Sequence, residues 1–142
     1  MAKKYFNKKE WYAWNLTLLT KFYWDKKVDY DTQCFTWLRI NRWGLPPNWQ
    51  PGHSTLLIRL STEIELPPTD FYLEMGLTTT EGYRPGHYFD SSGYNDLSHL
   101  NYARYCLHIK EWQPTPYVIR GDNWLTAVKC IYDAMASNKP MR

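Results

Sequence analysis

Hydrophobic and polar positions divide the chain into two helical segments with a group of strands between them. In the first segment, from Lys8 to Tyr23, the apolar residues recur at the spacing of one helix face: Trp11, Trp14, Leu18, Leu19 and Phe22. We therefore predict an amphipathic helix that buries this stripe.

Three segments after this helix read as strands: residues 34–43 and 70–77 alternate with a period of two, and residues 55–60 form a short apolar run. The last has the most regular alternation, and its apolar side chains share one face: Phe71, Leu73, Met75 and Leu77. Proline pairs at 46–47 and 67–68 end the intervening strands, because proline has no N–H group to donate to a neighbouring strand. The pattern predicts an antiparallel arrangement of these strands.

The rest of the chain reads as a long loop followed by a second helix. Residues 78–101 are rich in Gly, Tyr, Pro, Ser and Asp without a usable period, and long loops in small domains are commonly functional. Helical spacing returns at 122–136, where the central stripe is Trp124, Val128, Ile131 and Met135. We expect Asp122 to cap this helix. Helix, antiparallel strands, loop and helix together predict an α+β fold.

Composition indicates one globular domain over residues 1–142. The chain is 44% hydrophobic and 22% charged, which excludes a disordered chain, and it has no internal repeat. No apolar run reaches the roughly 18 residues of a membrane span, and the amino end lacks an apolar signal region. Three cysteines are too few for a disulfide framework. We therefore expect a reduced, cytoplasmic protein that does not associate with membranes.

The net charge of +3 is small, but basic residues gather near the amino end. They are Lys3, Lys4, Lys8 and Lys9, followed by the pair Lys26 and Lys27. A solvated helix face is the simpler explanation, so we expect no nucleic-acid partner. A small nucleic-acid-binding module that uses these lysines and exposed aromatic rings stays as an alternative.

Cys106 is the candidate for chemistry among the three cysteines. Cys34 lies on the apolar face of its predicted strand and Cys130 at the edge of the last helix stripe, so we expect both in the core. Cys106 instead follows the polar loop, with His99 before it and His108 after it. An accessible thiol in such surroundings could act as a nucleophile.

A metal site and a protease-like Cys/His pair are two further possibilities for these residues. A metal could be held by His99, Cys106 and His108 with His53 or His87, but the spacing matches no compact zinc pattern. We expect no metal and no cofactor. A protease-like Cys/His pair is also open, because it needs proximity in space and not in sequence.

A third chemistry is the transfer of an acyl group between thioesters. It needs an accessible thiol and a hydrogen-bond donor that stabilises the oxyanion when an amine attacks. Asn101, five residues before Cys106, could supply that donor through its amide.

The order of these motifs resembles the ubiquitin-conjugating enzyme fold, and within it a bacterial family from ubiquitin-like conjugation operons of antiphage defence. The matching elements are the proline stop Leu66-Pro67-Pro68, His99-Leu100-Asn101 in place of His-Pro-Asn, Cys106-Leu107 as the active-cysteine pair, the turn Trp112-Gln113-Pro114 and the closing helix from Asp122. Leu100 stands where the family has proline. The resemblance covers roughly residues 36–136.

The resemblance implies an amino-terminal helix, an antiparallel four-strand meander, a long active-site loop and a carboxy-terminal helix. It also implies a conjugating enzyme: a ubiquitin-like protein arrives as a thioester on an activating enzyme, passes to Cys106 and then to an amine of a target protein. Asn101, His99 and His108 complete the implied catalytic set, and the lysines near the amino end would dock the activating enzyme. Some members of the fold lack a working cysteine, so an inactive member that only binds a ubiquitin-like protein is the alternative.

Overall fold

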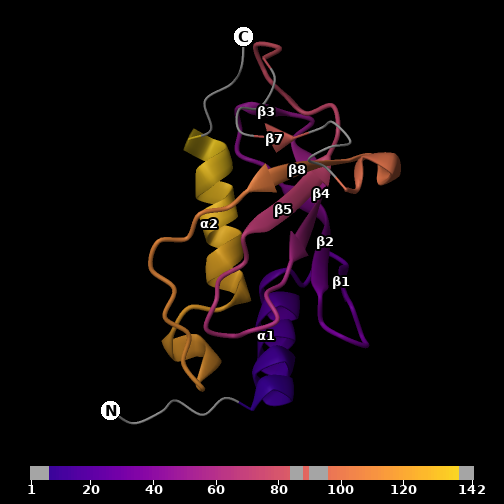
Figure 1. Ribbon diagram of the computed structural model, residues 1–142. Helices are drawn as coiled ribbons and strands as arrows, with labels where there is room; N and C mark the ends of the chain where they lie inside the picture. Colours follow the sequence, from indigo (N-terminus) through magenta and orange to yellow (C-terminus); the bar gives the residue numbers. More distant parts are fainter. Residues whose placement is uncertain (1–6, 84–87, 90–95, 138–142) are drawn as a thin grey trace.

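The computed structural model describes residues 7–83, 88–89 and 96–137, which form an α+β fold (Figure 1). Two helices, α1 (Lys8–Phe22) and α2 (Trp124–Ser137), accompany a six-stranded sheet. Across the sheet, the strands lie in the order β1 (Val28–Tyr30), β2 (Trp37–Gly44), β4 (His53–Arg59), β5 (Asp70–Glu74), β8 (Tyr102–Cys106) and β7 (Tyr88–Phe89). Strand β3 (Trp49–Gln50) pairs separately with β6 (Thr78–Thr79), and two short 3-10 helices are η1 (Ser98–Leu100) and η2 (Val118–Arg120).

Every neighbouring pair in the main sheet is antiparallel, and β1, β2, β4 and β5 follow one another as a meander. The chain then returns through the segment 78–101 to place β8 beside β5. The predicted loop therefore contains β6, β7 and η1, although residues 84–87 and 90–95 of it, including His87, lie outside the described residues. The prediction of a loop-like setting for Cys106 is wrong, because Cys106 is the last residue of β8.

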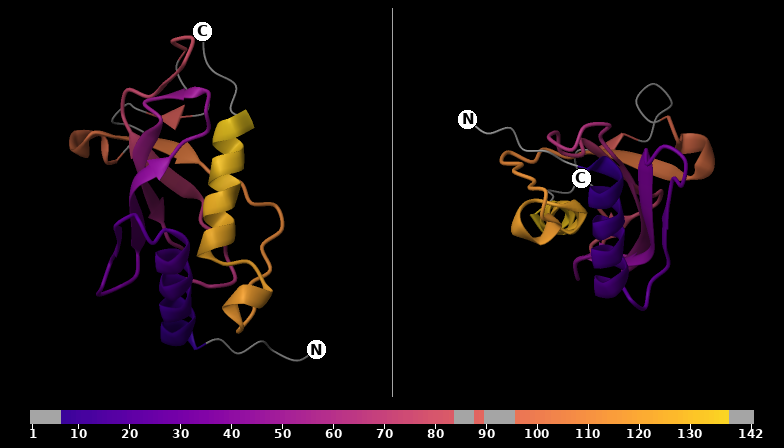
Figure 2. Two further views of the ribbon diagram at one scale, coloured as in Figure 1. Left: turned by 180° about the vertical axis from the view of Figure 1, so that it is seen from behind. Right: turned by 90° about the horizontal axis from the view of Figure 1, so that it is seen from below.

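Both helices lie on one side of the sheet (Figure 2). The strand residues that face them are fully or almost fully buried: Leu38, Ile40, Leu56, Ile58, Phe71, Leu73, Ala103 and Tyr105. The strands predicted at β2, β4 and β5 are therefore confirmed, and burial alternates along β2 and β4, whereas β5 buries Asp70 and Tyr72 as well as Phe71 and Leu73. In the described ranges, neither helix combines the length and the apolar composition that crossing a bilayer requires.

The buried face of helix α1 is shifted from the predicted one, although Trp11 and Leu19 of the predicted stripe are buried. Trp14 and Phe22, both assigned to the stripe, are 58% and 53% exposed, whereas Tyr12 and Asn15 are buried. The reason is the partner of this face: the Tyr12 ring lies against Trp124 at the start of α2, with centroids 5.3 Å apart. The helix itself is confirmed, and Asn7 caps it by accepting the Glu10 N–H.

Helix α2 begins one residue later than predicted, so its cap is Asn123 and not Asp122. The Asn123 side-chain oxygen accepts the Thr126 N–H at 3.0 Å, and its backbone C=O accepts the Ala127 N–H. Asp122 precedes the helix, and its carboxylate accepts the Gln113 N–H at 2.8 Å and the Thr126 hydroxyl of α2 at 3.3 Å. Asp122 thus ties the start of α2 to the turn that follows β8.

The predictions that Cys34 and Cys130 are core residues are wrong, since both are exposed. Strand β2 begins only at Trp37, so Cys34 lies in the preceding turn and has no place in the strand alternation. That turn is organised by Asp31, which accepts the N–H groups of Gln33, Cys34 and Thr36 and the Thr36 hydroxyl.

The hydrogen bonds to Asp31 predict a pH-dependent contribution to stability. The Thr36 hydroxyl, followed by the three backbone N–H groups, lowers the pKa of the Asp31 carboxyl from 3.8 to about 2. Because the pKa is lower in the folded protein, the stabilisation is fully present above about pH 4 and is lost as the pH falls toward 2. We expect Asp31→Asn to reduce the free energy of unfolding at pH 6 and to reduce it less at pH 2.5.

Chemical denaturation of both proteins at the two pH values measures this difference. Thr36→Val, which removes the largest contribution to the shift, should weaken the pH dependence. A difference between wild type and Asp31→Asn that is the same at both pH values would contradict the prediction.

Candidate functional site

Cys106 is exposed at the end of β8, directly across from Asp70 of β5. The next pair along the ladder is hydrogen-bonded, because the Leu107 N–H donates to the Thr69 C=O at 2.8 Å. Cys106 and Asp70 therefore form a non-hydrogen-bonded pair, the kind in which opposite side chains come closest. The thiol has a carboxylate as its immediate cross-strand neighbour.

The Asp70 carboxylate is held by Arg104, two residues before Cys106 on the same face of β8. Arg104 Nη2 donates to Asp70 Oδ2 at 2.9 Å, and only 11% of the Asp70 side chain and 30% of the Arg104 side chain are exposed. A partly buried ion pair of this kind is screened less than a surface pair. It places positive and negative charge in fixed positions beside an accessible thiol.

Of the other predicted site residues, His108 lies on the same side of the chain as Cys106. The burial alternates through this stretch: Cys106 is exposed, Leu107 is buried and His108 is exposed again. Residues two apart in an extended chain point the same way, with Cα atoms roughly 6.5 Å apart. Both side chains are therefore exposed at or just beyond the end of β8.

His99 and Asn101 are not brought to the thiol. Both are exposed and precede β8, whereas Cys106 ends it. Asn101 has φ of 68°, and its C=O accepts the Met75 N–H at 2.9 Å, so it forms the bend that leads into the strand. The five residues from Asn101 to Cys106 span about 16 Å in an extended chain. The predicted placement of an Asn101 amide and His99 beside the thiol is therefore wrong.

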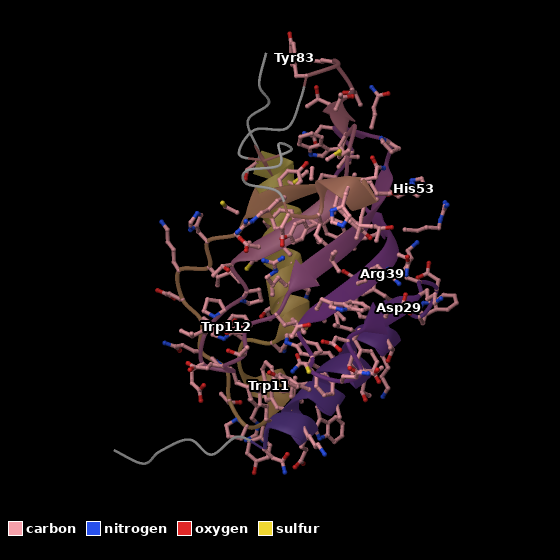
Figure 3. All side chains as sticks on the ribbon, turned by 45° about the vertical axis from the view of Figure 1, so that its right-hand side comes forward. Trp11, Asp29, Arg39, His53, Tyr83 and Trp112 are labelled. Atoms are coloured by element: carbon pink, nitrogen blue, oxygen red, sulfur yellow. The ribbon has the colours of Figure 1, made fainter. Side chains whose placement is uncertain are left out.

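The candidate metal ligands are also separated by the strands. His99 lies at the end of β8 opposite Cys106. His53, which Figure 3 labels, begins β4, whereas Cys106 lies level with Arg59 at the other end of β4. Within residues 7–83, 88–89 and 96–137, no group of three or more His, Cys, Asp or Glu side chains is placed to hold a metal ion. His87 is outside these ranges.

Exposure alone does not single out Cys106, because Cys34 and Cys130 are exposed as well. Cys34 lies in a turn, and Cys130 lies on α2, where burial raises the pKa of its thiol and the nearby carboxylates of Asp122 and Asp133 raise it further. A raised pKa leaves less of the reactive thiolate. Cys106 differs from both through the Asp70–Arg104 pair beside it.

Asp70 and Arg104 were missed as site residues in the sequence. Part of the signal was available, since Tyr102, Arg104 and Cys106 alternate with the apolar Ala103 and Tyr105, as the residues of a half-buried strand do. Asp70 could not be assigned without the register that pairs β5 with β8.

The chain was also compared with known proteins. No protein-family profile matches it, and neither a curated protein nor a solved structure matches it.

Proposed function

We propose that this chain is a conjugating enzyme of the bacterial ubiquitin-like type, with Cys106 as the residue that carries the thioester. The observation that supports this most directly is the exposed thiol at a strand end beside the Asp70–Arg104 ion pair. The arrangement of amino-terminal helix, antiparallel meander and carboxy-terminal helix agrees with what the motif resemblance implies.

In the proposed reaction, the Cys106 thiolate attacks the thioester carbonyl of the ubiquitin-like protein on its activating enzyme. The activating enzyme's sulfur leaves as a thiolate, and the acyl group is now bound to Cys106. An amine of the target protein then attacks this new thioester, the Cys106 sulfur leaves, and an amide forms. The proton lost by the amine needs an acceptor near the thiol, and we assign this role to His108.

The oxyanion formed in each attack needs a positive or hydrogen-bonding partner. Asn101 precedes β8, at the end of the strand opposite Cys106, so it is too far from the thiol for this role. We propose Arg104 instead, because its guanidinium lies on the same strand face as Cys106 and is oriented by Asp70. Antiphage defence is the process in which the motif resemblance places such an enzyme.

The test is adduct formation with the activating enzyme, the ubiquitin-like protein and ATP. We expect a protein adduct that thiol reductants release, and we expect Cys106→Ala to abolish it. Cys34→Ala and Cys130→Ala are matched controls that should retain it, because their thiols are also exposed but have no ion pair beside them. An adduct that survives Cys106→Ala would remove the assignment.

A second candidate is an inactive member that binds a ubiquitin-like protein without forming a thioester. The position of Asn101, before the first residue of β8 and so at the other end of the strand from the thiol, favours this candidate. It predicts stable binding of the ubiquitin-like protein, unchanged by Cys106→Ala, with no reductant-sensitive adduct. Binding measurements on wild type and Cys106→Ala therefore separate the two candidates.

A further inference from the structure

The sheet face opposite the helices contains a hollow of about 530 Å³ that does not include Cys106. Its apolar walls come from three parts of the chain: Trp37 of β2, Leu57 of β4, and Leu97 and Leu100 around η1. A cavity of this size and lining is within the range of small-molecule sites.

Two arginines also line the hollow, and they are placed to act together. In the register of β2 and β4, Arg39 lies opposite Leu57 and Arg59 lies opposite Trp37. The two arginines are therefore diagonal neighbours on adjacent strands, with their Cα atoms about 7–8 Å apart. Side chains of this length can bring both guanidinium groups to one anion.

Each guanidinium is oriented by a carboxylate and an aromatic ring, and the Tyr102 side chain also hydrogen-bonds to Arg39. Arg39 Nη2 donates to Asp29 Oδ2 at 3.0 Å, and Figure 3 shows these two residues side by side. Arg59 Nη2 donates to Asp96 Oδ2 at 2.5 Å, while Asp96 also accepts the Tyr72 hydroxyl at 2.7 Å. The Arg39 and Arg59 guanidinium groups lie over the rings of Trp37 and Tyr72, both at 5.5 Å from the centroid.

Both arginine side chains remain open to solvent, with 37% of Arg39 and 44% of Arg59 exposed. The ion pairs with Asp29 and Asp96 use Nη2 of Arg39 and Arg59, and a guanidinium carries five N–H donors in total. Further donors can therefore reach a ligand in the hollow.

We propose that this hollow binds a small amphipathic monocarboxylate, a free acid with an aliphatic or aryl body. The apolar body lies against Trp37, Leu57, Leu97 and Leu100, and the carboxylate is bound by Arg39 and Arg59. A carboxylate matches the planar fork of a guanidinium, and apolar walls favour a ligand with a long hydrocarbon part over a small inorganic anion.

Octanoate is the probe, with octanol and acetate as controls, measured by isothermal titration on the full chain. Octanol has the same chain without charge, and acetate has the charge without the chain. We expect octanoate to bind one to one, octanol to bind at least tenfold more weakly, and acetate to give no measurable heat. Equal affinity for octanoate and octanol, or no octanoate binding at millimolar concentration, would overturn the proposal.

Two substitutions should change octanoate affinity in opposite directions. Arg59→Gln removes one guanidinium and should weaken binding about tenfold. Asp96→Asn removes the carboxylate that competes for Arg59, yet it leaves an oxygen that can accept the Tyr72 hydroxyl, so it should strengthen binding severalfold. Changes in the same direction would show that the ligand does not use Arg59, and the proposal would fail.

A rim substitution keeps the test decisive if Arg59→Gln does not fold. Leu100 is 59% exposed, so Leu100→Asp should leave the fold intact and reduce octanoate affinity at least tenfold by placing a negative charge in the hollow. Ile119→Asp, at an 80% exposed position on η2 that is not part of the hollow, is the matched control and should bind normally. Equal affinity in the two variants would also refute the site.

Discussion

Replacing Trp49 with alanine is expected to lower the free energy of unfolding by about 3–5 kcal/mol. Trp49 belongs to the short strand β3 and is only 2% exposed. Its indole N–H donates to the Met135 C=O in the last turn of α2 at 2.8 Å, so one side chain joins the small β3–β6 pair to the closing helix. Alanine would lose the buried ring, leave a cavity and remove this bond.

Trp24→Ala provides the matched control, because the same atoms are removed from a side chain that is 82% exposed. It should change stability by no more than about 0.5 kcal/mol. Urea unfolding followed by far-ultraviolet circular dichroism measures both variants. A Trp49→Ala protein within about 1 kcal/mol of wild type would show that the contact with α2 is not part of the stable fold.

Replacing Asn15 is expected to have the next largest effect. Its side chain is fully buried, and its oxygen accepts the Trp124 N–H at 2.8 Å while its amide group donates to the Trp11 C=O at 2.9 Å. Trp124 is the first residue of α2, where the backbone N–H has no acceptor within the helix. Asn15→Ala leaves that N–H buried without its partner, so we expect a loss of about 2–3 kcal/mol.

Two variants separate this hydrogen bond from simple packing. Asn15→Leu restores volume but cannot accept the N–H, so it should remain destabilised. Thr17→Ala, on the exposed face of the same helix, removes a hydroxyl that bonds only to the Ala13 C=O and should have little effect. Thermal unfolding of the three proteins decides between the explanations, and wild-type stability in Asn15→Leu would contradict the capping role.

The proposed conjugating activity depends on neighbours of Cys106 that come from different parts of the chain. The two predicted partners that precede Cys106, His99 and Asn101, lie at the other end of β8 because a strand extends by about 3.3 Å per residue. Asp70, distant in sequence, lies directly opposite the thiol because β5 and β8 pair in that register. Proximity in sequence therefore identified His108 as a neighbour of the thiol but could not identify Asp70.

The residues that line the hollow on the sheet face also come from distant parts of the sequence. Trp37, Leu57 and Leu97 have no sequence relation to one another, and they meet because three separate segments converge on one face. The polar face of each strand could be predicted from its alternation. Which polar residues become neighbours depends on how the strands align.

The local periodicity of the sequence was sufficient for the helices and for the main strands β2, β4 and β5. In a strand or a helix, the direction of each side chain follows from its position along the chain, so a regular apolar pattern identifies the element and a buried face. This reasoning held for α2 and for Leu38 and Ile40 of β2.

Tertiary structure alone decided which side chains the partner elements cover. The start of α2 covers Asn15 of α1, while Trp14 of the same helix remains exposed despite being far more apolar. Cys34 and Cys130 are exposed although both were predicted to be in the core, because Cys34 lies in the turn before β2 and Cys130 lies outside the buried face of α2. Burial depends on contacts between distant segments, and a pattern read along the chain contains no information about the packing partner.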